Sequence, residues 1–362
     1  MALFSSFGEV NLDALDATIT DNAVDIFVYD TRKDSDGGKW RKRTKKTSWY
    51  NETLNTATRG SRRDFPAVAV IVAETDKVTI YDGDDPDLPM WMVFEGGSVT
   101  GWGNTTHLGT GTDNDTTSAT ALNSIICVGT SFNKGVRIFG FVEDKSRFRR
   151  NVSSSGNAIS TSGISERNTT QDTFVNIGSS TIANSIVNDV AMTVLPNAPI
   201  DDATGLPIPT IAVATNGGVS VIKDDGTVIS GGEANSSWRV NKLFIDSNYN
   251  IWGSEGSDYS PGIQLLSTLP YSSVADIGTG TLGYQLTTQV ITTYGRNTSW
   301  PFILGTYGVR ENRHVAGKEY IFNGARYGLT FLQDNTTNRS SSMVAYATTS
   351  CLSCTPNIGN TS

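Results

Sequence analysis

The sequence predicts an all-β protein, most simply a single β-propeller of about six or seven blades over residues 21–350. Three observations carry this prediction. The 36 glycines, together with dense Ser, Thr, Asn and Asp, mark frequent tight turns. Apolar runs of strand length alternate with these turns, while helical periodicity is nearly absent. The runs also recur as similar units, each too small to bury its own apolar face.

The N-terminal region predicts an arm followed by a hairpin. Residues 1–20 carry helix-like spacing of apolar side chains, so an arm or a short helix is expected there. The run 24–29 leads through a turn rich in Asp and Gly at 34–38 into 40–44, which predicts two paired strands. The first complete unit follows, with strands expected at 67–73, 77–81 and 91–94.

One unit then recurs: an apolar strand, a tight turn with Asx or Gly, and a more polar partner strand. It is found at 124–141, 210–229, 240–252 and 328–347, with weaker units expected at 170–195 and 270–310. Because the last unit is short of strands, N-terminal strands from 24–47 are expected to complete that blade and close the ring. Residues 351–362 are expected to form a flexible tail. A β-sandwich with long loops, or two smaller β domains, would also fit the strand pattern.

The charge distribution is strongly asymmetric. The chain has a net charge of −8, yet eleven Lys and Arg lie between Arg32 and Arg63 beside only three carboxylates. We interpret this stretch as a partner-binding surface. Its members are Arg32, Lys33, Lys39, Trp40, Arg41, Lys42, Arg43, Lys45, Lys46 and Trp49. The tryptophans would serve as apolar anchors. Nucleic acid is the alternative partner, but an acidic protein repels a polyanion at long range, so an acidic subunit is favoured.

The motifs for metals and cofactors are weak. Four carboxylates crowd one turn and form a calcium candidate, but the twelve-residue loop of a dedicated calcium site is missing. They are Asp82, Asp84, Asp85 and Asp87. Cys351 and Cys354 form a single CxxC without a second ligand pair, so unpaired thiols are expected, whereas Cys127 has apolar neighbours and should be core. We expect no cofactor.

Catalytic signatures are absent from the sequence, which has no nucleophile elbow, phosphate-cradling loop or HExxH. We therefore expect a protein that is not an enzyme. Distant carboxylates could still serve a glycoside hydrolase, and the candidates are Glu74, Glu95, Glu143 and Glu255. Trp102, in a Gly-Trp-Gly loop, is the best candidate for stacking on a sugar. Packing is expected for Trp40, Trp91, Trp238 and Trp252.

Two segments resemble a known family. YDTRKDSDGGKWRKR (29–43), continuing in TSWYNE (47–52), resembles a recurrent N-terminal signature of marine bacteriophage structural proteins. PIPTIAVATNGGVSVIKDDG (207–226) is similar to a segment of the same proteins, which are propeller-bearing tail proteins of podovirus-like phages. The resemblance implies a virion protein of the tail, in the tube, nozzle or fibre-attachment region, that works by protein–protein assembly.

The resemblance also implies partners and a location. Partners would be other tail proteins and further copies of the chain in a symmetric tail, in a virion produced in the host cytoplasm. Two alternatives stay open: a propeller at the tail tip that binds a receptor or a host-surface glycan, and a glycan-degrading enzyme. Neither direct nucleic-acid binding nor membrane insertion is expected. The longest apolar run, 65–73, is too short to span a bilayer, and residues 1–10 do not read as a secretory signal.

Overall fold

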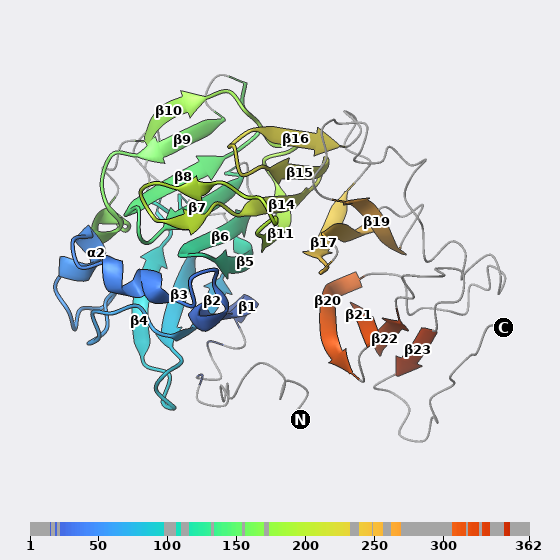
Figure 1. Ribbon diagram of the computed structural model, residues 1–362, viewed down its shortest axis with the longest axis horizontal. Helices are drawn as coiled ribbons and strands as arrows, with labels where there is room; N and C mark the ends of the chain where they lie inside the picture. The colour runs from blue at the N-terminus through green and yellow to red at the C-terminus, as the bar shows by residue number, and fades with distance from the viewer. Residues whose placement is uncertain are drawn as a thin grey trace. The chain divides into compact units, whose positions relative to one another are not determined.

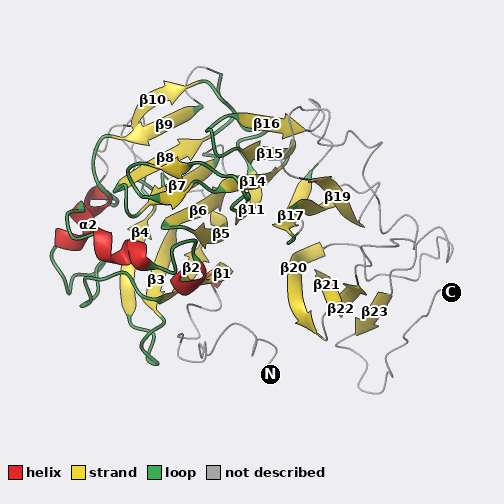
Figure 2. Ribbon diagram, in the orientation of Figure 1, coloured by secondary structure: helices red, strands yellow, loops and turns green. Residues whose placement is uncertain are grey.

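The computed structural model shows a chain built almost entirely of antiparallel strands (Figures 1 and 2). It describes residues 15, 19, 22–97, 106–109, 116–131, 134–153, 156–169, 174–231, 239–247, 249–255, 262–268, 306–315, 318–325, 328–333 and 344–347. The predicted all-β class is confirmed. The chain forms two compact units, 1–213 with 221–228 and 214–220 with 229–362, and each is described by itself. None of the described helices is long and apolar enough to cross a membrane.

The first sheet is a four-stranded meander. Its strands are β1 (Ala23–Asp30), β2 (Val68–Glu74), β3 (Lys77–Asp82) and β4 (Met90–Glu95), in the order β1-β2-β3-β4. Every residue of β2 is buried, which its run of Val, Ile and Ala explains. Ile71 packs in one apolar cluster, while Val70 and Val72 pack in another on the opposite face.

The second sheet has six strands, in the order β10-β9-β8-β7-β6-β5. Their bounds are β5 (Thr116–Leu122), β6 (Ile125–Thr130), β7 (Val136–Gly140), β8 (Lys145–Arg149), β9 (Asn157–Ser160) and β10 (Phe174–Gly178). A short 3-10 helix, η4 (Ile164–Glu166), lies between β9 and β10. The unit predicted at 124–141 corresponds to β6 and β7, which pair as expected.

A third sheet follows, in the order β11-β14-β15-β16, and a two-stranded ribbon precedes β14. The bounds are β11 (Val187–Thr193), β12 (Ile200–Asp201), β13 (Leu206–Pro207), β14 (Thr210–Thr215), β15 (Gly218–Ile222) and β16 (Val228–Gly231). The strands predicted within 210–229 are therefore confirmed.

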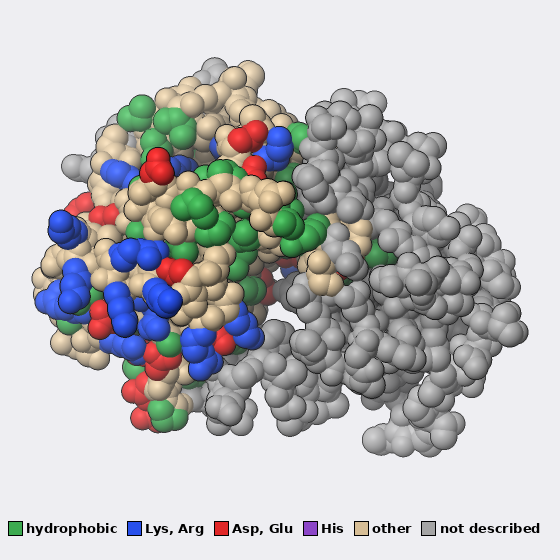
Figure 3. Space-filling view, viewed as in Figure 1, with side chains coloured by type: hydrophobic (Ala, Val, Ile, Leu, Met, Phe, Trp, Pro, Cys, Tyr) green, Lys and Arg blue, Asp and Glu red, His purple; other side chains and the backbone are tan. Residues whose placement is uncertain are grey.

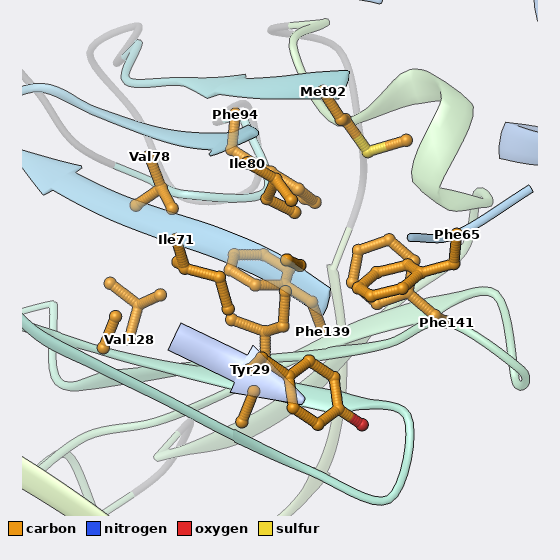
Figure 4. Close-up of a cluster of buried hydrophobic side chains, with 14 of the residues drawn as sticks. Tyr29, Phe65, Ile71, Val78, Ile80, Met92, Phe94, Val128, Phe139 and Phe141 are labelled. Atoms are coloured by element: carbon orange, nitrogen blue, oxygen red, sulfur yellow. The ribbon is translucent and has the colours of Figure 1, made fainter. Parts of the chain in front are cut away.

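The core lies on both faces of the second sheet. Ile126 and Val128 of β6 join an aromatic-rich cluster with the first sheet, part of which is shown in Figure 4. Cys127, between them in sequence, points the other way and packs with Val187 and Val213 of the third sheet. Because successive side chains of β6 point to opposite faces of the sheet, this strand contributes to the apolar clusters on both faces. The prediction that Cys127 is a core residue is confirmed. Complete burial raises the pKa of its thiol far above the usual range.

Two further sheets lie in the second unit. One has the order β17-β18-β19, with β17 (Val240–Ile245), β18 (Asn250–Glu255) and β19 (Gly262–Thr268). The other has the order β20-β21-β22-β23, with β20 (Thr306–Val315), β21 (Lys318–Ala325), β22 (Gly328–Gln333) and β23 (Val344–Ala347). Strands predicted within 240–252 and 328–347 are present in these sheets.

The predicted closure by N-terminal strands is wrong for residues 24–47. β1 pairs with β2 and so belongs to the first sheet, while the last sheet takes all four of its strands from residues 306–347. The second strand of the expected hairpin is instead a 3-10 helix, η3 (Lys39–Arg43). Trp40 is the segment's buried residue, so the alternation that a half-buried strand needs is missing. Blade number and ring closure stay predictions, and the arm and the tail lie outside the described residues, Leu15 and Ile19 excepted.

Candidate interaction surface

The basic stretch forms the connection from β1 to β2. It folds into three short helical turns, η2 (Thr31–Lys33), η3 (Lys39–Arg43) and α2 (Ser48–Asn51). Seven cationic side chains on these turns and between them are exposed, and we call them the basic surface: Arg32, Lys33, Lys39, Lys42, Arg43, Lys45 and Lys46. Figure 3 shows Lys and Arg gathered over this helical segment. Arg41 is half-buried and donates to the carbonyl oxygens of Gly38 and Phe65.

The two tryptophans of the predicted surface point inward. Trp40 and Trp49 are both 0% exposed, so their predicted role as anchors for a partner is wrong. Trp40 packs on Phe65, with ring centroids 5.1 Å apart, and Trp49 packs on Trp91 at 5.5 Å. Large aromatic side chains contribute most when they are buried, and this cluster already accommodates them. Packing is confirmed for Trp40, Trp91 and Trp252, whereas Trp238 and Trp102 lie outside the described residues.

A buried carboxylate, Asp34, holds the first half of the connection. Its Oδ2 accepts hydrogen bonds from the Tyr29 hydroxyl (2.5 Å) and from Nε1 of Trp40 (2.7 Å). Its Oδ1 accepts the backbone N–H of Asn123 (2.9 Å), which comes from the turn between β5 and β6. Burial raises the pKa of Asp34, and these three donors partly offset that rise. Burial also raises the pKa of Tyr29 well above its usual range, so this hydroxyl stays a donor.

A second carboxylate, Asp144, fixes the second half. It accepts the backbone N–H of Ser48 (2.6 Å), the Ser48 hydroxyl (2.8 Å) and the N–H of Ile164 (2.9 Å). Next to it, Nε1 of Trp49 donates to the carbonyl oxygen of Phe141 (2.8 Å). The helix α2 is therefore attached to the second sheet by polar contacts that are mostly shielded from water.

A third anchor joins two buried guanidinium groups to one carboxylate. Arg167 donates to both oxygens of Glu52 (2.8 and 3.1 Å), and Nε of Arg59 lies 3.6 Å from Glu52 Oε1. Arg59 also donates to the carbonyl oxygen of Trp91 (2.8 Å), and its guanidinium carbon lies 4.4 Å from the centroid of that indole ring. Burial lowers the pKa of Arg59 to about 10, although Glu52 acts in the opposite direction.

The basic surface keeps most of its charge uncompensated. Asp30 pairs with Arg32 at 2.8 Å and with Lys33 at 4.0 Å, and the hydrogen bond from Arg32 lowers the pKa of Asp30. Arg43 pairs with Asp36 (2.9 Å) and donates to the backbone carbonyl oxygen of Thr204 (2.8 Å). Within the part of the chain that the structure describes, four lysines have no ion pair: Lys39, Lys42, Lys45 and Lys46.

Two of the four calcium candidates form ion pairs with an arginine of the same chain. Nη1 of Arg62 lies 2.8 Å from oxygens of both Asp82 and Asp84. Asp84 also accepts the N–H groups of Ala67 and Val68. Asp85 accepts the N–H of Asp87, as in an ordinary turn. In the described ranges no three His, Cys, Asp or Glu side chains come together that could hold a metal ion.

Two of the carboxylates considered for hydrolysis are held in ion pairs. Glu74 lies 3.4 Å from Nζ of Lys77, and Glu143 is paired with Arg147. The backbone N–H of Glu95 donates to Oδ1 of Asn168 (2.8 Å). The cysteines of the CxxC lie outside the described residues. Sequence reasoning identified the cations of the surface but missed its anchors, Asp144 and Arg167, because each lies about a hundred residues from the segment it holds.

Comparisons with known proteins leave the family open. No family model and no curated protein sequence matches the chain. Among solved structures, the WD40 domain of Neurospora crassa Pan2 is similar, with 9% identity, a TM-score of 0.34 and coverage of 78% of this chain and 76% of that one. The Malassezia sympodialis allergen Mala s 1 is similar too, with 8% identity, a TM-score of 0.35 and coverage of 77% and 83%. Likenesses at these scores decide neither blade number nor function.

Proposed function

We propose that this chain is an assembly protein of a bacteriophage tail, and that its basic surface docks on an acidic face of a neighbouring subunit. The tail assignment rests on the resemblance of residues 29–52 and 207–226 to phage structural proteins. The docking surface rests on one structural observation. Four lysines that have no ion pair among the described residues lie on a connection that is anchored from beneath at Asp34, Glu52 and Asp144.

The anchors matter because they lower the entropic cost of binding. A loose basic loop would have to be ordered when a partner binds, whereas this backbone is already fixed by buried hydrogen bonds. With Trp40 and Trp49 buried, the surface offers charge and lysine stems rather than aromatic anchors. Such a surface is suited to steering and to partner choice, with an interaction that weakens as salt rises.

The experiment compares a surface variant with a charge-matched control. The variant replaces Lys39, Lys42, Lys45 and Lys46 by Gln. The control replaces four lysines that lie elsewhere in the described structure by Gln, namely Lys77, Lys145, Lys223 and Lys242. Each gene replaces the natural one in the phage that encodes it, and purified particles are analysed by quantitative mass spectrometry. We expect the wild-type chain in the particles, an at least tenfold loss of the surface variant, and near-normal incorporation of the control.

Two results would contradict the proposal. Absence of the wild-type chain from particles would reject the virion role. Normal incorporation of a folded surface variant would reject the docking surface. A separate titration with a fluorescent DNA duplex at low salt tests the alternative: DNA binding that is lost in the surface variant while assembly stays normal would assign these lysines to nucleic acid.

A further inference from the structure

A buried arginine that has no counter-ion among the described residues lies in the second sheet. Arg137, on β7, is 2% exposed. It pairs in register with Phe148 of β8 and with Val128 of β6, so it stands on the face of the sheet that carries the aromatic-rich core. Neither Nε nor Nη1 of its guanidinium has a hydrogen-bond partner among the described residues.

The neighbouring charged groups are also cations. Burial, together with repulsion from nearby Arg150, lowers the pKa of Arg137 to about 9. Burial lowers the pKa of Lys134 as well, with added repulsion from Arg137 and Arg150. Nothing in the described surroundings acts in the opposite direction on these two groups, because no carboxylate is close enough to favour their charged forms. Three cations therefore share one end of the second sheet.

The other described neighbours of the guanidinium are aromatic rings and backbone. The guanidinium carbon of Arg137 lies 4.7 Å from the ring centroid of Phe148 and 5.9 Å from that of Phe174. The carbon of Arg150 lies 4.9 Å from the same Phe148 ring. On another side the backbone of Gly109 packs on the guanidinium: a Cβ at position 109, where φ is +71°, would lie 2.1 Å from Nη2. These groups lie against the guanidinium of Arg137, and no carboxylate of the described residues pairs with it.

We propose that Arg137, with Lys134 and Arg150, binds a small tetrahedral oxyanion of the phosphate or sulfate class. A buried charge is tolerated when it is paired and hydrogen-bonded, and aromatic rings replace only part of the water that a guanidinium loses. The planar donor fork of arginine matches two oxygens of such an anion, and the two neighbouring cations supply the remaining charge. The source is either the free inorganic ion or a sulfate or phosphate ester on a sugar, and the burial of Arg137 favours the free ion.

The test measures thermal unfolding of the full chain in sodium sulfate or phosphate against sodium chloride of equal ionic strength. We expect the oxyanions to raise the Tm of the wild-type chain by about 3–6 °C. Arg137→Met should abolish this rise while leaving the Tm in chloride equal to the wild-type value or higher, since the uncompensated charge is gone. The matched control is Arg147→Met in the adjacent strand, whose arginine is paired with Glu143, and it should keep the rise.

The control is needed because sulfate stabilises most proteins without binding to a site. An equal rise in Arg137→Met would therefore overturn the proposal. If that variant does not fold, calorimetric titration of the wild-type chain with sulfate decides: one saturable site, weakened severalfold by Lys134→Gln, supports the proposal, and no saturable binding overturns it. A parallel titration with galactose 6-sulfate identifies the source, because binding of the ester without binding of inorganic sulfate assigns the site to a glycan group.

Discussion

A hydrogen bond between Trp40 and Asp34 holds the first half of the connection from β1 to β2 in place. The indole Nε1 donates to Asp34 Oδ2 at 2.7 Å, and both side chains are buried. The same carboxylate also accepts hydrogen bonds from the Tyr29 hydroxyl and from the backbone N–H of Asn123. It therefore joins the connection to β1 and to the turn between β5 and β6. Trp40, a residue of the basic stretch, thereby holds the cations in place without touching a partner.

The first prediction concerns this carboxylate. Asp34→Ala leaves three donors buried without an acceptor, so we expect a loss of about 3 kcal/mol or more in the free energy of unfolding. Tyr29→Phe removes one of these donors and leaves the carboxylate with two others. It also removes the acceptor of the buried Ser124 N–H, so it should cost about 1–2 kcal/mol. Urea unfolding followed by tryptophan fluorescence measures both. Equal, small effects of the two substitutions would show that Asp34 does not organise the connection.

The second prediction concerns Glu52, the shared acceptor of Arg59 and Arg167. Glu52→Gln removes the negative charge that two buried guanidinium groups share, and we expect it to cost about 3–5 kcal/mol. Asp36→Asn breaks the exposed pair with Arg43 and should cost less than about 1 kcal/mol. Comparison of the two urea midpoints tests this ranking. If the Glu52→Gln protein were as stable as Asp36→Asn, the backbone carbonyl partners alone would be enough to stabilise the buried guanidinium groups of Arg59 and Arg167.

The sequence predicts the strands well where local pattern is sufficient. Runs such as 68–74 and 125–130 are apolar, β-branched and bounded by turns, and no other element suits them. The pattern fails at 39–43, because Gly38, in the left-handed region at φ +75°, turns the chain into a 3-10 helix. From the sequence, Trp40 could pack in the core or contact a partner, because a tryptophan among cations suits both roles. Its burial in the structure assigns it to the core.

The candidate site is predictable only in part for a related reason. The excess of Lys and Arg is visible in the sequence, and so is their exposure in a segment without apolar alternation. Their anchors are not visible, because Asp144 and Arg167 reach the connection through tertiary folding. Arg137 gives no signal either, because an arginine between Val136 and Ile138 is typical of the polar face of a strand. Its burial follows from tertiary contacts with Phe148, Phe174 and Gly109.

The third prediction uses two adjacent glycines. Gly37 and Gly38 both have positive φ, +67° and +75°, so alanine at either position is strained by roughly 1 kcal/mol. A Cβ at 37 meets nothing within 4 Å, but at 38 it would lie 2.9 Å from the carbonyl oxygen of Thr31. Gly38→Ala should therefore destabilise the protein by about 2 kcal/mol, clearly more than Gly37→Ala. Thermal unfolding of the two variants side by side provides the measurement, and equal Tm values would contradict the close approach.

The last prediction concerns acid stability and Asp84. Burial raises the pKa of this carboxyl, but the N–H groups of Ala67 and Val68 and the guanidinium of Arg62 outweigh burial, so its pKa is lowered from 3.8. A carboxyl whose pKa is lower in the folded chain binds fewer protons there than in the unfolded chain. Its stabilising contribution is therefore fully present above about pH 4–5 and is lost as the pH falls through the lowered pKa.

Asp84→Asn removes this contribution, so the variant should be less stable than the wild type at pH 6. The difference should shrink as the pH falls below 3.8, where the wild-type carboxyl also becomes neutral. Asp87→Asn is the matched control from the same turn, because the structure gives the Asp87 carboxylate no ion pair among the described residues. Urea midpoints measured from roughly pH 2.5 to pH 6, on either side of the ordinary pKa of an Asp carboxyl, measure the effect. A difference that grows toward low pH would show that the hydrogen bonds to Asp84 favour its neutral form.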